Sequence, residues 1–290
     1  MLGREKSKFI LIAKLVSLIT VVVGFIILGP IFGIIGLAGV IVIASVLQAG
    51  FLAFSNNLYA AGKSAKKVED IDFNFEGIFG TYDRNQLQRG LQVYTEVCAG
   101  CHGLEQVAFR SLGDPGGPEM EPKQVKAYAE LYEVFDNELD DYRAAIPSDK
   151  FPSSGIENAP DLSLMAKARA GFHGPYGTGI NQLIKGMGGP EHIVSLLLGF
   201  NEEEKEQAGS VLYGNDIYPG GWIAMAQPLW GDDVEYMDGT EATVEQEAED
   251  VAAFLMWTAE PKLNARKEFG FTSILFLTIL GGLLYLTNKR

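Results

Sequence analysis

The stretch Val97–His102 holds two cysteines and a histidine, and it constrains the chain more than any other feature. Its order, Cys98-x-x-Cys101-His102, is the spacing of a c-type haem attachment site. Thiols three positions apart on one helical turn can each bond covalently to one vinyl group of the porphyrin, and the adjacent imidazole can bind the iron. Both cysteines of the chain lie in this motif. The sequence therefore predicts one covalently attached haem c, with His102 as an axial ligand of the iron.

Paired cysteines also occur in thioredoxin-like redox sites and in zinc sites. A thioredoxin-like pair normally lies in a βαβ context, which this sequence lacks. A structural zinc ion needs four protein ligands, and no further cysteine is available. Haem attachment is the favoured interpretation, and the other two stay open.

Charge is distributed unevenly along the 290 residues, whose formal net charge is −14. Residues 1–62 carry +3 and residues 262–290 carry +4, so residues 63–261 carry −21. This balance argues against nucleic-acid binding, because an acidic domain repels a polyanion. It favours a basic protein partner, since summed charge steers encounters. A merely solvated acidic surface would give the same composition.

The C-terminal end carries the clearer membrane signal. Residues 269–287 are nineteen residues without a charge, about 29 Å as a helix, which matches the hydrocarbon core of a bilayer. Lys289 and Arg290 follow, so the C-terminus is expected in the cytoplasm. Residues 262–290 are therefore predicted to be a transmembrane anchor, with the preceding domain on the periplasmic side of the bacterial inner membrane.

The N-terminal residues 1–62 hold two apolar runs, 9–28 and 31–54, after a basic start. They are interpreted as an apolar leader or membrane segment(s). A leader would be removed near residues 60–65. A retained hairpin would need a periplasmic N-terminus, against the positive-inside tendency. We favour the leader, and the hairpin stays a rival.

The remaining residues 63–261 are expected to form a periplasmic cytochrome c haem domain. Helices are predicted over Arg84–Val97, Asp161–Arg169, Glu191–Phe200 and Val244–Thr258. Asp83 with Gln86, and Thr243, are the expected capping residues of the two longer helices. The β-strand signal is poor throughout. The fold class is therefore mainly α: a c-type cytochrome domain with long loops and a C-terminal transmembrane helix.

The second axial ligand of the iron must come from elsewhere in the chain. The candidates are Met120, Met165, Met187, Met225, Met237, Met256, His173 and His192. Met165 and Met256 lie in apolar helical segments that indicate packing. Met225 lies in Pro219–Leu229, where small residues permit close approach and apolar ones exclude water. A thioether ligand stabilises ferrous iron and raises its potential. Met225 is favoured over the other candidates, which stay open on these grounds.

Further segments follow one another in an order that is specific to one family. They are Phe75–Gly80, Arg89–Tyr94, Cys98–His102, Pro160–Ser163, Ala168–Arg169, Gly220–Met225, Tyr236–Thr240 and Phe254–Trp257, before the terminal anchor. From about Phe73 to its end, the chain resembles the cytochrome c1 family, the haem subunit of the cytochrome bc1 complex, in its α-proteobacterial form. The haem motif alone is shared by hundreds of cytochromes, but the ordered combination is highly specific.

The resemblance implies a haem site made of Cys98, Cys101, His102, Met225, Arg169 and Pro160. His102 and Met225 would be the two iron ligands. Arg169 matches the family arginine that pairs with a haem propionate, because a buried carboxylate needs a cation; an exposed helix charge is the alternative for this residue. Pro160 matches the proline that lines the haem pocket.

Two departures from the family pattern bear on this site. His192 stands where many relatives have a tyrosine near the haem; it is interpreted as a surface or core histidine, with a changed hydrogen bond to the haem edge as the alternative. No cysteine is left for the additional disulfide that some bacterial relatives carry. The loop before Met225 must therefore be held by packing alone, or be shorter.

The resemblance further implies an electron-transfer subunit of quinol–cytochrome c oxidoreductase, with no catalytic residue of its own. Single electrons would pass from a Rieske iron–sulfur protein through the haem to a basic cytochrome c acceptor. Cytochrome b would be a further partner, and the complex would be dimeric. The acidic residues that would steer the acceptor are Glu202–Glu204, Asp232, Asp233 and Glu235.

Two other functional classes stay open. One is a stand-alone membrane-anchored c-type haem enzyme such as a peroxidase, which needs an open or displaceable sixth site. The other is a structural or zinc-binding membrane protein without a redox role.

Overall fold

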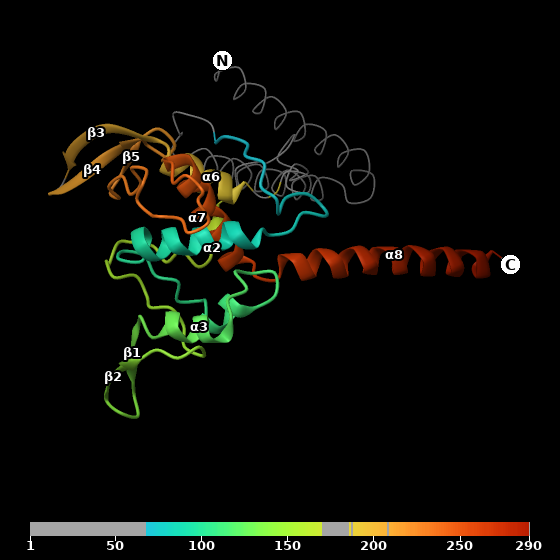
Figure 1. Cartoon of the computed structure of the whole chain (residues 1–290). Helices are drawn as coiled ribbons and strands as arrows, with labels where there is room; N and C mark the ends of the chain where they lie inside the picture. Colours follow the sequence, from blue (N-terminus) through green and yellow to red (C-terminus); the bar gives the residue numbers. More distant parts are fainter. Residues whose placement is uncertain (1–67, 170–185, 187, 208, 290) are drawn as a thin grey trace, which may run out of the picture. The chain divides into compact units, whose positions relative to one another are not determined.

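The structure is a computed structural model, and it describes residues 68–169, 186, 188–207 and 209–289 (Figure 1). The predicted leader or membrane segment over residues 1–62 lies outside the described residues. His173 and Met187, two of the candidate ligands, lie outside them as well.

Helices α2 (Arg84–Val93) and α7 (Val244–Ala259) pack against each other in the core of the described domain (Figure 1). Their backbones approach closely at Gly90, where an added Cβ atom would lie 2.0 Å from the carbonyl oxygen of Asp250. Only glycine permits that approach. Trp257 of α7 is among the largest fully buried side chains. This pair of helices therefore supports the segment that follows α2, which includes Cys98, Cys101 and His102.

Both long helices begin as their capping residues predict. The Asp83 carboxylate accepts a hydrogen bond from Gln86 N at 2.9 Å, and the Thr243 hydroxyl accepts one from Gln246 N at 3.2 Å. After Val93 the chain continues as a π-helical turn over Tyr94–Cys98. The predicted helices of residues 84–97 and 244–258 are thus confirmed.

The shorter predicted helices are right in kind and wrong in extent. Helix α4 spans only Met165–Ala168, because the Asp161 carboxylate accepts a bond from Ser163 N and forms a turn instead. Helix α6 spans Gly189–Leu197 and so ends before Phe200, which begins a strand. Two further helical segments are α3 (Pro122–Ala129) and a 3-10 turn over Phe109–Gly113.

In keeping with the poor β-strand signal of the sequence, the described residues contain only two small antiparallel sheets. One sheet pairs β1 (Glu133–Asp136) with β2 (Asp141–Ala144), and the other has the order β3 (Phe200–Gln207), β4 (Ser210–Asn215), β5 (Trp222–Ile223). Strand β3 reads as four glutamates, a lysine and two amides after one phenylalanine, a composition that strands disfavour. It forms at the exposed edge of its sheet, where charged side chains are tolerated.

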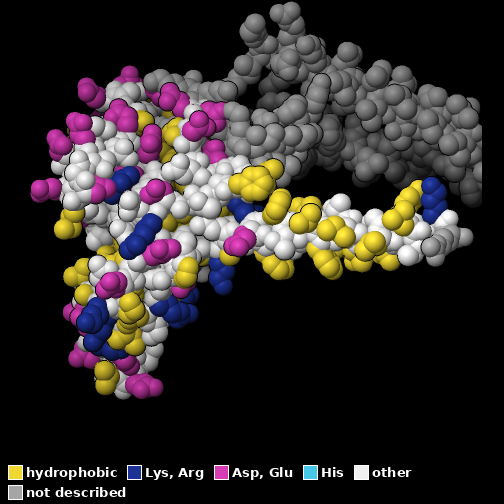
Figure 2. All heavy atoms as spheres, turned by 45° about the vertical axis from the view of Figure 1, so that its right-hand side comes forward, with side chains coloured by type: hydrophobic (Ala, Val, Ile, Leu, Met, Phe, Trp, Pro, Cys, Tyr) yellow, Lys and Arg dark blue, Asp and Glu magenta, His cyan; other side chains and the backbone are white. Residues whose placement is uncertain are grey.

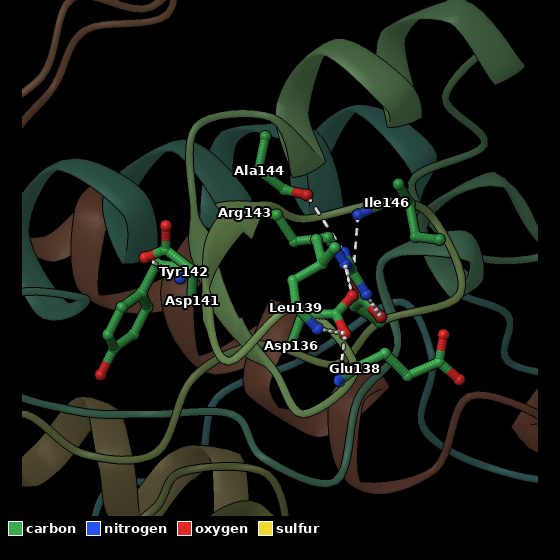
Figure 3. A network of polar contacts seen from close by, with 9 residues as sticks. Asp136, Glu138, Leu139, Asp141, Tyr142, Arg143, Ala144 and Ile146 are labelled. Carbon is green, nitrogen blue, oxygen red and sulfur yellow. Dashed lines mark hydrogen bonds and ion pairs between the residues drawn. The ribbon is translucent and has the colours of Figure 1, made fainter.

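The β1–β2 hairpin is held by one arginine (Figure 3). The Arg143 guanidinium donates to Asp136 Oδ2 and to Asp149 Oδ2, each at 2.7 Å, and to the Ala144 carbonyl at 3.1 Å. It holds the pKa of both carboxyls below the usual range. Asp149 also accepts a bond from Ile146 N at 2.9 Å, so the network fixes the chain as it leaves the hairpin.

The last helix, α8 (Leu263–Asn288), has a mean hydropathy of 2.0 in its most apolar window and is long and apolar enough to cross a membrane. That window is 0% buried in the chain itself. Figure 2 shows hydrophobic side chains along its length. The helix fits the predicted C-terminal anchor, and the architecture is that of a mainly helical domain with long loops.

Candidate haem site

The two cysteines and His102 are gathered on one tight turn at the end of α2. The amides of Cys101 and His102 both donate to the carbonyl of Cys98, at 3.1 and 2.9 Å. Neither thiol is in a disulfide; Cys98 is half-buried and Cys101 is exposed. Burial, with a smaller contribution from Cys101, raises the pKa of the Cys98 thiol to about 12. A thioredoxin-like pair needs a lowered thiol pKa, so the environment of Cys98 disfavours that alternative.

The imidazole of His102 is oriented by a backbone carbonyl. Its Nδ1 lies 2.8 Å from the carbonyl oxygen of Pro160. A carbonyl oxygen only accepts, so Nδ1 carries the proton and donates it, and Nε2 keeps its lone pair. This is the arrangement by which proteins prepare a histidine for metal binding. The family resemblance implies that Pro160 lines the haem pocket, and in the structure its carbonyl contacts the ring of His102.

The Pro160 carbonyl is positioned by one main-chain hydrogen bond and one main-chain to side-chain hydrogen bond, which join two loops. Leu162 N donates to Gly103 O at 2.9 Å, and Glu105 N donates to Asp161 Oδ2 at 2.8 Å. The segment after Pro160 is therefore fastened to the segment after His102. No local pattern in the sequence reveals these bonds, because their partners are more than fifty residues apart.

Tyr94 is a supporting residue of this turn. Its hydroxyl donates to the His102 carbonyl at 3.0 Å, and its ring is fully buried beside Phe151 and Phe254. Burial raises the pKa of the phenol above its usual value, so it stays a donor. Helical spacing predicts a core position for Tyr94 but not this hydrogen bond.

Met225 lies two residues after β5 and is half-buried. Strand β5 is held by β4, through the pairs Tyr213 with Ile223 and Gly214 with Trp222. The ammonium of Lys205 on β3 also lies 4.2 Å from the centroid of the Trp222 ring, a cation–π contact. The strand before Met225 is thus held by pairing and packing without a disulfide, as the cysteine count requires.

The chain after Met225 is fastened to α7. Asp233 N donates to Glu247 Oε1 at 3.0 Å, and Asp232 N donates to Ala242 O at 2.7 Å. The Glu247 side chain is fully buried, and burial together with the nearby Asp233 carboxylate raises its pKa to about 7. The Met225 segment therefore lies between a small exposed sheet and the first turn of a core helix.

The other described methionines are used differently. Met256 is buried in α7, and Met120 and Met165 pack against the core. Met237 is fully exposed, at 101% of its reference area. Packing roles for Met256 and Met165 agree with their predicted interpretation. Met120, Met165 and Met225 are all half-buried, but of these three described methionines only Met225 does not pack against the hydrophobic core.

Arg169 and His192 lie near each other, which the sequence did not indicate. Helix α6 begins against α4, since a Cβ on Gly189 would lie 1.6 Å from the Ala166 carbonyl. Burial, and then the charge of Arg169, lower the pKa of the His192 imidazole, so His192 is neutral at pH 7. Arg169 is exposed and makes no ion pair or hydrogen bond with a described residue.

These groups fit a covalently attached haem. Two free thiols and an imidazole with an available Nε2 stand on one turn, and the exposed guanidinium of Arg169 suits a propionate. A zinc site has less support: among the described residues, no group of three or more His, Cys, Asp or Glu side chains is arranged to hold a metal ion.

Comparison with known proteins places the same part of the chain in one group. A family model described as the cytochrome c1 family matches residues 73–290. Cytochrome c1 of Cereibacter sphaeroides is 57% identical over 245 residues, which cover 77% of this chain and 86% of the relative. Cytochrome c1 of Rhodobacter capsulatus is 48% identical, with 77% and 88% covered. The cytochrome b-c1 complex catalytic subunit of Candida albicans mitochondria is 36% identical, with 81% and 82% covered.

Proposed function

The chain belongs to the cytochrome c1 family, and from this premise we propose that it relays single electrons through one covalent haem held by His102 and Met225. Membership makes it a haem-containing electron-transfer subunit of the cytochrome bc1 complex. When bound, the haem supplies an iron that changes its charge by one electron. The observation that carries the proposal is the bond from His102 Nδ1 to Pro160 O, which leaves Nε2 for the metal.

Each residue of the site has a defined task in this proposal. Cys98 and Cys101 would attach the cofactor through thioether bonds. The cofactor could then be lost only if these covalent bonds were broken. His102 Nε2 and Met225 Sδ would hold the iron, and the thioether would favour its ferrous state. Arg169 pairs with a propionate and offsets its charge.

If His102 and Met225 hold the iron together, no coordination position would be left for oxygen or peroxide. This coordination distinguishes an electron carrier from a stand-alone haem peroxidase, which needs an open or displaceable sixth site. His192 is neutral and lies close to Arg169. We assign it no direct role in binding the iron.

The partners follow from the complex to which the family belongs. We propose that the Rieske iron–sulfur protein donates the electron and that a basic cytochrome c accepts it. Cytochrome b would pack beside α8 in the membrane, and the complex would be dimeric. The haem domain would be periplasmic and the C-terminus cytoplasmic, because Lys289 and Arg290 end the apolar run.

An acidic surface supports the basic acceptor, and Figure 2 shows many Asp and Glu side chains on the visible face of the domain. Five of the six acidic residues predicted to steer the acceptor are exposed: Glu202, Glu203, Glu204, Asp232 and Glu235. The sixth, Asp233, is half-buried and accepts bonds from Trp230 N and Gly231 N, at 2.6 and 3.0 Å. Its carboxylate belongs to its own turn, so the outer strand β3 is the stronger docking element.

Carbon monoxide tests the coordination. The reduced holoprotein is expected to bind the gas slowly and incompletely, because Met225 must first leave the iron. Fast and complete binding would contradict the His102–Met225 assignment and favour the peroxidase class. Steering is tested separately by the rate at which the acceptor oxidises the reduced haem. That rate is expected to fall with ionic strength, and a rate independent of salt would refute the acidic docking face.

A further inference from the structure

A loop over residues 73–80 exposes two large apolar side chains beside the start of α8. The loop is a compact turn, in which Glu76 N donates to Phe73 O and Thr81 N donates to Asn74 O, each at 3.0 Å. Phe73 and Phe75 are buried and stack at 4.9 Å between ring centroids. The next apolar residues do the opposite: Ile78 is 67% exposed and Phe79 is 74% exposed. Nothing in the packing of the described domain accounts for this adjacent pair.

The 73–80 loop is attached to the first turns of α8. The Lys267 ammonium donates to the carbonyls of Phe75 and Gly80, at 2.5 and 3.0 Å. The ring of Phe79 meets that of Phe271 edge-on, with 5.5 Å between centroids. One ionic donor and one ring contact therefore hold the exposed tip of the loop against the helix.

The position of Phe271 in the helix gives the depth of the loop tip. Glu268 is the last charged residue before the nineteen uncharged residues of 269–287. Phe271 lies three residues further, about 4.5 Å along the helix axis. The uncharged run is about as long as the hydrocarbon core is thick, so its first turn must lie at the boundary of that core. Phe79, in contact with Phe271, is at the same depth.

The charges around the loop suit the same location. Lys262 and Arg266, exposed near the start of α8, lie on the side where lipid headgroups would be. Burial, and then the neighbouring Glu191 carboxyl, raise the pKa of Glu76 to about 9. The one acid of the loop is therefore uncharged at neutral pH, which removes the group that a bilayer would most strongly exclude.

We propose that Ile78 and Phe79 insert into the periplasmic leaflet of the bilayer, among acyl chains just below the headgroups. This inference rests on the proposed role of α8 as the membrane anchor, with which the loop surface is continuous. The domain then touches the membrane at two points, the helix and the loop. A second contact resists rotation of the domain about the helix axis and fixes which face it presents to soluble partners.

Spin labels on the full-length holoprotein in phospholipid nanodiscs test the insertion. A nitroxide at Phe79→Cys is compared with one at Val211→Cys, an exposed apolar position on β4, and one at Leu277→Cys within α8. Collision with oxygen, which concentrates in lipid, is measured against collision with a nickel chelate in water. Haem absorption checks that each variant is folded, and unmutated holoprotein, whose cysteines carry the haem, must take up no label.

The oxygen-to-nickel accessibility ratio at residue 79 is expected to resemble that at 277 and to exceed that at 211 several-fold. A water-like ratio at 79 with a lipid-like ratio at 277 would overturn the loop insertion and leave the anchor intact. A water-like ratio at 277 would overturn the anchor itself. The same measurement in the assembled complex tests whether another subunit covers the loop. A label at 79 that is shielded from both reagents would mean that a subunit, rather than lipid, lies against it and would overturn the insertion.

Discussion

The two sides of the proposed haem site are built from different kinds of structure. The side with His102 follows α2 in the chain, and α2 packs against the buried face of α7. The side with Met225 follows β5, a two-residue edge strand. The opposite edge strand of the same sheet, β3, is exposed. The first is supported by the two long helices of the core, whereas the second depends on strand pairings near the surface.

The ionic contacts on the two sides differ in the same way. Arg89 of α2 donates to both carboxylate oxygens of Asp250 on α7, at 2.8 and 3.0 Å, and the Asp250 side chain is 0% exposed. The contact that backs the Met225 side is the half-buried Lys205–Trp222 pair. We infer that the His102 side carries the stability of the domain, while the Met225 side sets the electronic properties of the iron and is the easier one to perturb.

The largest expected effect concerns attachment itself. Replacing both cysteines, Cys98→Ser with Cys101→Ser, should abolish covalent haem, because no other thiol exists in the chain. Haem staining after denaturing electrophoresis measures the loss. Each single replacement should retain one bond and stain more weakly. Full staining of the double variant would refute thioether attachment at this motif.

Next in size is the helix pair that supports the His102 side. Arg89→Met leaves the buried Asp250 carboxylate without its cation, which should cost roughly 3–5 kcal/mol of unfolding free energy. For a domain of this size that lowers Tm by roughly 6–20 °C, measured by circular dichroism on the detergent-solubilised holoprotein. The matched control is Arg143→Met, which also loses two carboxylate partners but is 31% exposed. The control should lose far less; equal losses would break the comparison.

The Met225 side should respond to pH through Glu247. Its pKa is raised in the folded state, so folding favours the protonated form. The stability is complete below the ordinary glutamate pKa and is lost as pH rises through about 7. Tm should therefore fall by a few degrees as pH rises from mildly acidic to mildly alkaline. Glu247→Gln, which keeps the acceptor for Asp233 N, should flatten this dependence, whereas Glu245→Gln, on the exposed face of the same turn, should leave it unchanged.

The smallest effect concerns the cation–π contact before Met225. Lys205→Gln should cost roughly 0.5–1 kcal/mol, as expected for a partly exposed pair. It should also lower the reduction potential slightly, since β5 is held less firmly. The control is Lys123→Gln, which removes an exposed positive charge on α3. Comparing the reduction potentials of the two variants separates the effect of the cation–π contact from the effect of the lost charge. An identical shift in both variants would mean that Lys205 acts only through its charge.

Local chemistry was readable from the sequence, and long-range geometry was not. The cap at Asp83, the cap at Thr243 and the turn from Cys98 to His102 each depend on residues within four positions, and each is present. The strand β3 was missed because its glutamates oppose strand formation, and its pairing with β4 outweighs that preference.

The site residues divide along the same line. Family resemblance selected Arg169 and Pro160, but only the fold brings Arg169 near His192 and the Pro160 carbonyl to His102. Glu247 and Tyr94 gave no signal beyond helical spacing, because their roles depend on partners in other loops or on main-chain atoms. The assignment of Met225 stays a prediction, supported by its surroundings and by the family.

One redox titration tests the central claim that a methionine closes the iron. Met225→Leu keeps the size and apolar character of the side chain but removes the sulfur, and Met237→Leu makes the same change at a fully exposed position. With haem still attached, the potential of the Met225 variant should fall by on the order of 0.1 V or more, within the range of roughly 0.8 V that axial ligands span. The Met237 variant should keep the original potential. An unchanged potential in Met225→Leu would show that another residue is the sixth ligand and would contradict the account.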